Sequence, residues 1–143
     1  MMRVNLIKES EMVDEFVSQM SSEAYFVREV PVFAKSVDIV KVDINKKRIS
    51  AIEFKTTNWR KAELQVLGSA IAFDFLEICI IKPITEKCRN SIIEECEEQG
   101  IGLYFMDNDS KVIEHVVKPI HREGVWERQR KQIVEYVSQR IQK

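Results

Sequence analysis

The chain has 143 residues, of which 45% are hydrophobic and 31% charged, and its formal net charge is −1. This size and composition are typical of one globular domain and exclude a disordered chain. The charge gives no overall attraction to nucleic acid. Residues 118–143, however, carry seven Lys and Arg and three Asp and Glu, a local charge of +4 that would permit phosphate contacts.

The longest hydrophobic run, residues 68–84, contains Asp74 and Glu77, which excludes a membrane-spanning helix. The first residues acquire acidic side chains at once and lack the hydrophobic core of a signal peptide. We therefore expect a cytoplasmic protein.

The first half of the chain predicts a helix, a strand and a hairpin. The helix covers residues 10–20, where hydrophobic side chains recur at helical spacing. Residues 23–33 alternate as in a strand and place Pro31 near its end or at a sheet edge. Residues 36–44 and 48–56 read as two further strands joined by the short polar turn 45–47.

The second half alternates helices with strands. Residues 58–75 predict a helix that Asn58 caps, and its buried face is expected to carry Leu64, Leu67, Ile71 and Phe75. Residues 76–84 read as a mostly apolar, central strand.

A helix over 85–100 follows, capped by Thr85 and ended by Gly100. Residues 101–107 and 111–117 read as strands, and 125–142 as a terminal helix. This order predicts an α/β protein with three layers, α/β/α, around a central mixed sheet.

Asp38, Glu53 and Lys55 interrupt the two apolar strands of the hairpin. Side chains two residues apart share a face of a strand, so Glu53 and Lys55 point the same way. A two-residue turn centred on 45–46 or 46–47 would put Asp38 opposite Glu53 or Lys55 and turn Asp43 away. A three-residue turn would reverse this arrangement.

Such a cluster would have a specific chemistry. Two carboxylates in contact repel each other unless a cation lies between them. Mg²⁺ or Mn²⁺ suits a few carboxylates, water and phosphate oxygens, and a nearby lysine can position water or stabilise charge on phosphorus. The alternative is an ordinary solvated pair of charges on an exposed strand face.

The pattern "VDIV", then "IEFK", then a helix carrying Gln65 resembles the PD-(D/E)XK nuclease superfamily, which has the restriction-endonuclease-like fold. The resemblance covers roughly residues 9–117, although Val37 stands where the family name has a proline. It implies that Asp38, Glu53 and the backbone carbonyl of Phe54 bind the metal.

By the same resemblance, Lys55 is the catalytic lysine and Gln65 lies near the active site. A glutamate of the first helix would join them. Glu9, Glu11 and Glu15 are candidates, and Glu15 is preferred because it lies mid-helix.

The implied function is a Mg²⁺- or Mn²⁺-dependent nuclease that hydrolyses DNA or, as a second choice, RNA. The nucleic acid would be contacted by Lys55, Gln65, Trp59 and Arg60. For Trp59, the favoured alternative is that it seals its helix against the sheet. The alternative is an inactive nuclease-like fold that serves as a binding or regulatory module.

We expect a single domain with its core over residues 9–117 and a basic C-terminal helix over 125–141. Specificity would then come from loops, a homodimer or a partner protein. Arg128, Arg130 and Lys131 of the terminal helix are either a solvated face or a phosphate-binding stripe, and the solvated face is favoured. The hydrophobic residues of this helix, Ile133, Val134, Val137 and Ile141, would dock on the core or on a second subunit.

Five other residues could suggest a metal site, but their spacing argues against one. We interpret Cys79, Cys88 and Cys96 as reduced packing residues because they form no CxxC pair. His115 is expected to be an exposed strand residue, and His121 is too far from it in sequence for a helical ligand pair.

Overall fold

The computed structural model describes residues 5–43, 45 and 48–141, and in it six strands form one sheet in chain order. The strands are β1 (Ala24–Val32), β2 (Lys35–Asp43), β3 (Ile49–Lys55), β4 (Phe75–Ile81), β5 (Gly102–Met106) and β6 (Ile113–Val117). The pairs β1–β2, β2–β3 and β5–β6 are antiparallel, whereas β3–β4 and β4–β5 are parallel. The sheet is therefore mixed, as predicted.

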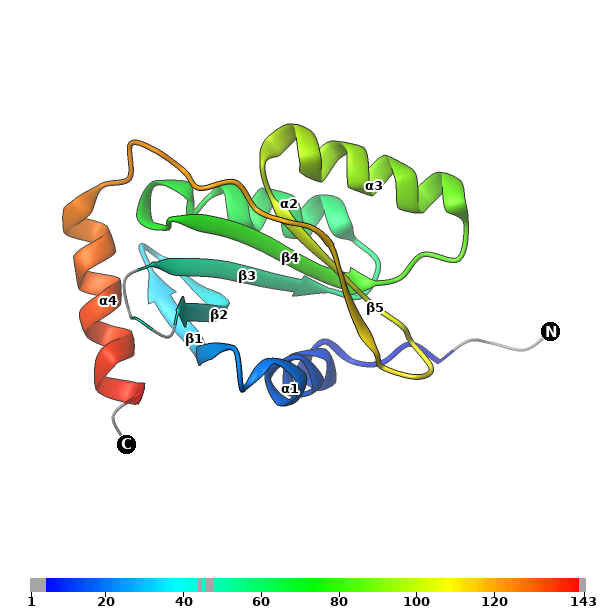
Figure 1. The fold of residues 1–143 in the computed structure, drawn as a ribbon, viewed down its shortest axis with the longest axis horizontal. Helices are drawn as coiled ribbons and strands as arrows, with labels where there is room; N and C mark the ends of the chain where they lie inside the picture. The colour runs from blue at the N-terminus through cyan, green and yellow to red at the C-terminus, as the bar shows by residue number, and fades with distance from the viewer. Residues whose placement is uncertain (1–4, 44, 46–47, 142–143) are drawn as a thin grey trace.

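Helices cover both faces of this sheet (Figure 1). They are α1 (Glu9–Met20), α2 (Trp59–Leu67), α3 (Glu86–Gln99) and α4 (Glu127–Ile141), with a 3₁₀ turn, η1 (Ala70–Ala72), after α2. One hydrophobic cluster joins the sheet to α2, α3 and α4, and a second joins it to α1. The molecule thus has the three layers that the sequence predicts.

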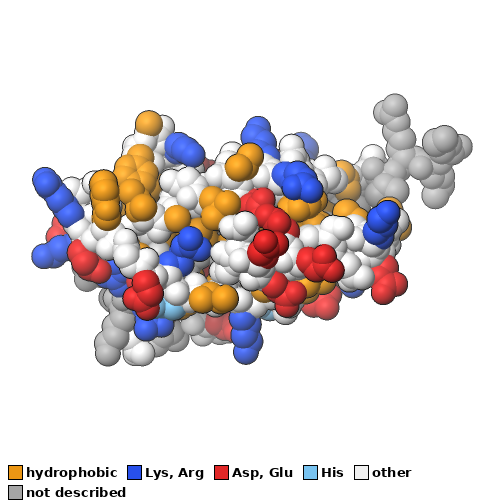
Figure 2. Space-filling model, turned by 90° about the horizontal axis from the view of Figure 1, so that it is seen from above, with side chains coloured by type: hydrophobic (Ala, Val, Ile, Leu, Met, Phe, Trp, Pro, Cys, Tyr) orange, Lys and Arg blue, Asp and Glu red, His pale blue; other side chains and the backbone are white. Residues whose placement is uncertain are grey.

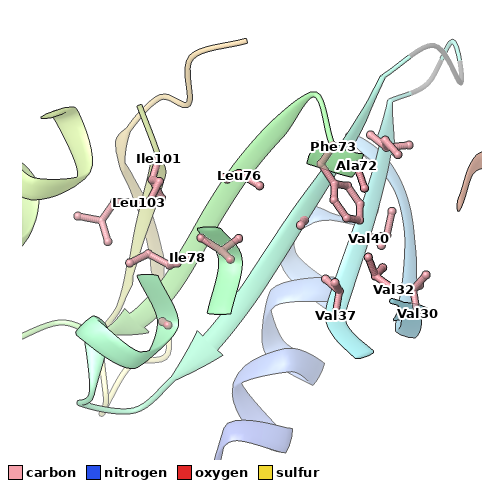
Figure 3. Packing of buried hydrophobic residues seen from close by; sticks show 14 of the residues in the cluster. Val30, Val32, Val37, Val40, Ala72, Phe73, Leu76, Ile78, Ile101 and Leu103 are labelled. Atoms are coloured by element: carbon pink, nitrogen blue, oxygen red, sulfur yellow. The ribbon is translucent and has the colours of Figure 1, made fainter. Parts of the chain in front are cut away.

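The larger cluster runs across the sheet from β1 to β5. Figure 3 shows its side chains, from Val30 and Val37 at one side, through Phe73, to Ile78 and Leu103 at the other. Phe73 is completely buried. In the smaller cluster Phe16 of α1 makes edge-on contacts with Phe54 and Tyr104, which fixes α1 against β3 and β5.

Local sequence features set the helix ends. The side chain of Asn58 accepts a hydrogen bond from the backbone N–H of Lys61, and that of Thr85 accepts one from Cys88, so both predicted caps are confirmed. Gly100 ends α3 in the left-handed conformation, with φ 71°, which glycine adopts without strain.

The predicted helix over residues 58–75 is wrong in its length and in its buried face. The α-helix ends at Leu67, and Leu64 is 69% exposed. Ala62, Glu63 and Val66 are buried instead. The apolar spacing that suggested a long helix continued past the real helix end, at Leu67.

Helix α4 belongs to the fold, because Ile133 and Val137 are buried in the larger cluster. The prediction that these residues dock on the core is confirmed. For Arg130 the favoured solvated face is wrong: its Nε lies 3.1 Å from the buried Asp74 carboxylate. Asp74 also accepts the backbone N–H of Ile49, so it ties α4 to the start of β3.

The three cysteines are free thiols, and Cys79 and Cys96 are buried, as the packing interpretation requires. Burial raises the pKa of Cys96 to about 12, so this thiol stays protonated. Across the residues described, no helix combines the length and apolar character needed to cross a membrane.

Candidate active site

The candidate site lies where the β2–β3 hairpin opens. The last paired positions of the ladder are Ile39 and Ile52. The next step along both strands places Asp38 opposite Glu53, which is one of the two registers expected from a two-residue turn. Residues 44, 46 and 47 of that turn lie outside the described part of the chain.

Two hydrogen bonds join the strands beyond the ladder. The Asp38 carboxylate accepts the backbone N–H of Phe54 through Oδ2 at 2.8 Å. The Glu53 carboxylate accepts the backbone N–H of Asp38 through Oε1 at 3.3 Å. The Asp38 side chain thus takes an N–H group that would otherwise seek a strand partner, and both carboxylates are held in fixed positions.

The two acids strongly affect each other's protonation. Burial, followed by repulsion from Asp38, raises the pKa of Glu53 to about 8. Burial also raises the pKa of Asp38, although the N–H of Phe54 opposes this rise. The pair therefore binds a proton near neutral pH, which a divalent cation would displace.

Lys55 follows Glu53 by two residues, and its charge lowers the pKa of Glu53. Its Nζ lies 3.4 Å from Oε1 of Glu9, the first residue of α1. The preferred first-helix glutamate, Glu15, instead accepts a hydrogen bond from Gln19 of its own helix. The structure therefore places Glu9, not Glu15, at the site, because it is the start of α1 that approaches the end of β3.

Three further predicted residues lie on α2. Trp59 is half-buried and packs against the larger cluster, and the Arg60 guanidinium lies 4.4 Å from the centre of its ring. Gln65 is half-buried one residue before the buried Val66. Within the described residues, Gln65 makes no hydrogen bond to Asp38, Glu53 or Lys55.

The donor set suits a cation that needs few protein ligands. Across residues 5–43, 45 and 48–141, no group of three or more His, Cys, Asp and Glu side chains is arranged to hold a metal ion. Asp38 and Glu53 are a pair, and Mg²⁺ is commonly bound by one or two carboxylates with water and phosphate completing its shell. Two adjacent carboxylates with raised pKa values fit such an ion.

A second polar cluster, which the sequence pattern did not predict, lies on the α1 face of the sheet. The completely buried Glu77 of β4 accepts a hydrogen bond from the Tyr104 hydroxyl at 2.9 Å, and its other oxygen lies 2.9 Å from Lys41 Nζ. Gly102 stands beside it, where an added Cβ would come within 2.9 Å of Glu77 Cγ.

His115 completes this cluster. Its ring stacks on Tyr104 with centroids 4.2 Å apart, and its Nε2 lies 3.8 Å from Glu77. The prediction that His115 is an exposed strand residue is confirmed, and one face of its ring is covered by Tyr104. Burial lowers the pKa of His115, so it is neutral near pH 7. Asp43 and Lys41 border a cavity on this face, so Asp43 points away from Glu53, as expected.

Comparison with known proteins identifies the fold but not the function. No protein-family model and no curated protein matches the chain. The SPO1766 protein of unknown function from Silicibacter pomeroyi superposes with a TM-score of 0.66 at 17% identity, over 95% of this chain and 90% of that one.

A repair endonuclease from Pyrococcus abyssi superposes with a TM-score of 0.50 at 18% identity. The match covers 75% of this chain but only half of that protein's length. At these identities the likeness shows the fold alone. A mixed six-stranded sheet flanked by helices is consistent with the restriction-endonuclease-like class, so the predicted fold class is confirmed.

Proposed function

We propose that this protein is a metal-dependent nuclease that hydrolyses phosphodiester bonds in DNA, with RNA as the alternative substrate. The observation that carries the proposal is the contact between Asp38 and Glu53 at the open end of the hairpin, with Lys55 beside them. The likeness to a repair endonuclease supports the same reading at the level of the fold.

In this proposal Asp38, Glu53 and the carbonyl of Phe54 hold Mg²⁺ or Mn²⁺. The bound ion would supply a Lewis acid and lower the pKa of a water molecule. Lys55 places a positive charge where negative charge develops on the phosphate, and Glu9 holds the lysine side chain in place. Specificity would be provided by surface loops, a second copy of the chain or a partner protein.

Cleavage of DNA tests the proposal. The purified chain is incubated with single-stranded and plasmid DNA in Mg²⁺, in Mn²⁺ and in EDTA. Cleavage is expected with either metal and not in EDTA, and Lys55→Ala should slow it by at least about 100-fold. Lys61→Ala is the matched control, because Lys61 is an exposed residue of α2 and its side chain has no part in the proposed site.

A second candidate function is a nuclease-like fold that binds nucleic acid without cutting it. The observation in its favour is that the acidic pair has no third carboxylate among the described residues that would complete a metal-binding group. Binding of DNA that is equally strong in wild type, Asp38→Asn and Lys55→Ala, with no cleavage by any of them, would establish this function instead.

A further inference from the structure

Next to the candidate site lies an apolar cavity of about 310 Å³, bordered by Trp59 of α2, by Ile84 and by Leu6. This volume is at the lower end of the range for pockets that hold small organic groups. Ile84 is 88% exposed and Leu6 is 44% exposed. The rim of the cavity therefore presents hydrophobic surface to solvent.

The exposed Ile84 is held in place by its neighbours. The guanidinium of Arg89 in α3 donates to the carbonyls of both Pro83 and Ile84 at 2.8 Å. Thr85 begins the cap of α3 at the next position. A side chain that is kept in solvent by a fixed loop is available to a ligand without a cost for ordering the loop.

The cavity adjoins the acidic pair along the chain and across the sheet. Thr57 borders it and follows Lys55 by two residues, so their Cα atoms are at most about 7.6 Å apart. The carbonyl of Thr56 accepts the N–H of Ile81, another residue of the cavity wall, at 3.1 Å. A polynucleotide whose phosphate lies at Lys55 would thus carry a neighbouring base to the cavity.

Charge around the cavity favours a polyanion. Lys82 is the only charged side chain among the described residues that border it, and its Nζ lies 3.4 Å from Glu114. Arg60 lies over the Trp59 ring and adds a further positive charge beside the cavity. Helices α2 and α3 both begin at its edge, where their N-terminal ends carry partial positive charge. Figure 2, seen from the α2–α3 side, shows hydrophobic side chains at the surface beside both basic and acidic side chains.

We propose that this cavity receives an unstacked base of a single-stranded or unpaired segment, so that the protein prefers such strands to duplex DNA. A base within a duplex is already stacked and paired, whereas an unpaired base can stack on an aromatic side chain. This inference rests on the proposed function only in taking the strand to pass Lys55.

The test is binding without cleavage. Fluorescence anisotropy in EDTA compares a labelled 12-nucleotide single strand with the corresponding 12-base-pair duplex. The single strand should bind at least 10-fold more tightly. Ile84→Ser should weaken single-strand binding about 10-fold and leave duplex binding unchanged. Trp59→Ala should also weaken single-strand binding. Ile84→Ser is the cleaner test, because Ile84 is exposed whereas Trp59 packs against the core.

Ile120→Ser is the matched control, because Ile120 is 63% exposed and contacts Gly100 away from the cavity. Equal affinity for single strand and duplex, or equal effects of Ile84→Ser and Ile120→Ser, would overturn the inference. A change of oligomeric state in Ile84→Ser, seen by sedimentation, with unchanged single-strand binding would also overturn it and assign the rim to a second copy of the chain.

The outcomes separate this inference from the proposed nuclease. Metal-dependent cleavage with no preference for single strands would contradict the base-binding cavity alone. Tight, Ile84-dependent binding of single strands without any cleavage would contradict the nuclease alone.

Discussion

Asp38 and Glu53 face each other across the open end of the hairpin, and the Asp38 N–H donates to the Glu53 carboxylate at 3.3 Å. The β2–β3 ladder does not continue past Ile39 and Ile52. Beyond this point each of the two carboxylates accepts a backbone N–H group across the hairpin, which holds both side chains in place.

The first prediction concerns the glutamate of α1. Glu9→Gln should lower metal-dependent cleavage by about 10-fold, because residues that orient a group at a metal site typically contribute this much. Lys55 would lose the charge that now lies 3.4 Å from its Nζ. Rates with saturating DNA measure the effect. Glu15→Gln is the control, and an equal loss in both variants would mean that Glu9 has no special role.

The second prediction concerns the buried carboxylate of Glu63. Burial, with a hydrogen bond and repulsion from Glu95 of α3, raises the pKa of Glu63 to about 7. The folded state therefore binds a proton that the unfolded chain releases near pH 4.5. The stabilisation that the protonated Glu63 side chain gives the folded state is complete below pH 4.5 and is lost as the pH rises through about 7.

Thermal unfolding at pH 5 and pH 8 measures this effect. Between these pH values the melting temperature should fall more in wild type than in Glu63→Gln, by about 3 °C or more. Glu94→Gln, which removes an exposed acid of α3, should behave as wild type. Parallel pH profiles of wild type and Glu63→Gln would show that Glu63 is ionised in the folded protein.

The third prediction concerns the buried ion pair on the α1 face. Lys41→Met should lower the free energy of unfolding by about 3 kcal/mol, because it removes the cationic partner of the buried Glu77 side chain. Lys41→Met combined with Glu77→Gln should recover part of this loss. Chemical denaturation of the wild type, Lys41→Met, Glu77→Gln and the double variant gives the coupling energy. A double variant no more stable than Lys41→Met would show that the pair contributes nothing through its charges.

The fourth prediction concerns the attachment of α4. Arg130→Met should destabilise the fold by about 2 kcal/mol, because Asp74 loses a charged hydrogen-bond donor. Arg128 is exposed, so Arg128→Met should change stability by less than about 0.5 kcal/mol. Similar denaturation midpoints for the two variants would rule out a stabilising role for the Arg130–Asp74 pair.

The hairpin and its acidic pair could be predicted because a strand has a period of two and the turn fixes the register. A two-residue turn had to be assumed to place Asp38 and Glu53 on one face, and the pairing of Ile39 with Ile52 agrees with that register. The position of Glu9 could not be obtained in this way. It depends on how α1 lies along β3, which is set by the contacts of Phe16 with Phe54 and Tyr104.

The second polar cluster was missed for a related reason. In the sequence Glu77 only interrupts a hydrophobic run. Its partners Lys41, Tyr104 and His115 lie on three other strands, and only the order of the strands brings them together. Periodicity also misjudged the buried face of α2. It places Leu64 there, whereas Glu63 is buried and forms a hydrogen bond with Glu95 of α3.

Binding of Mn²⁺, followed by electron paramagnetic resonance at pH 8, tests the acidic pair most directly. We predict one bound ion per wild-type chain and at least about 10-fold weaker binding in Asp38→Asn and in Glu53→Gln. Asp109→Asn, at an exposed position, is the control. If neither substitution in the pair altered the affinity, or if the wild type bound no Mn²⁺, the two strand carboxylates would not be a metal site.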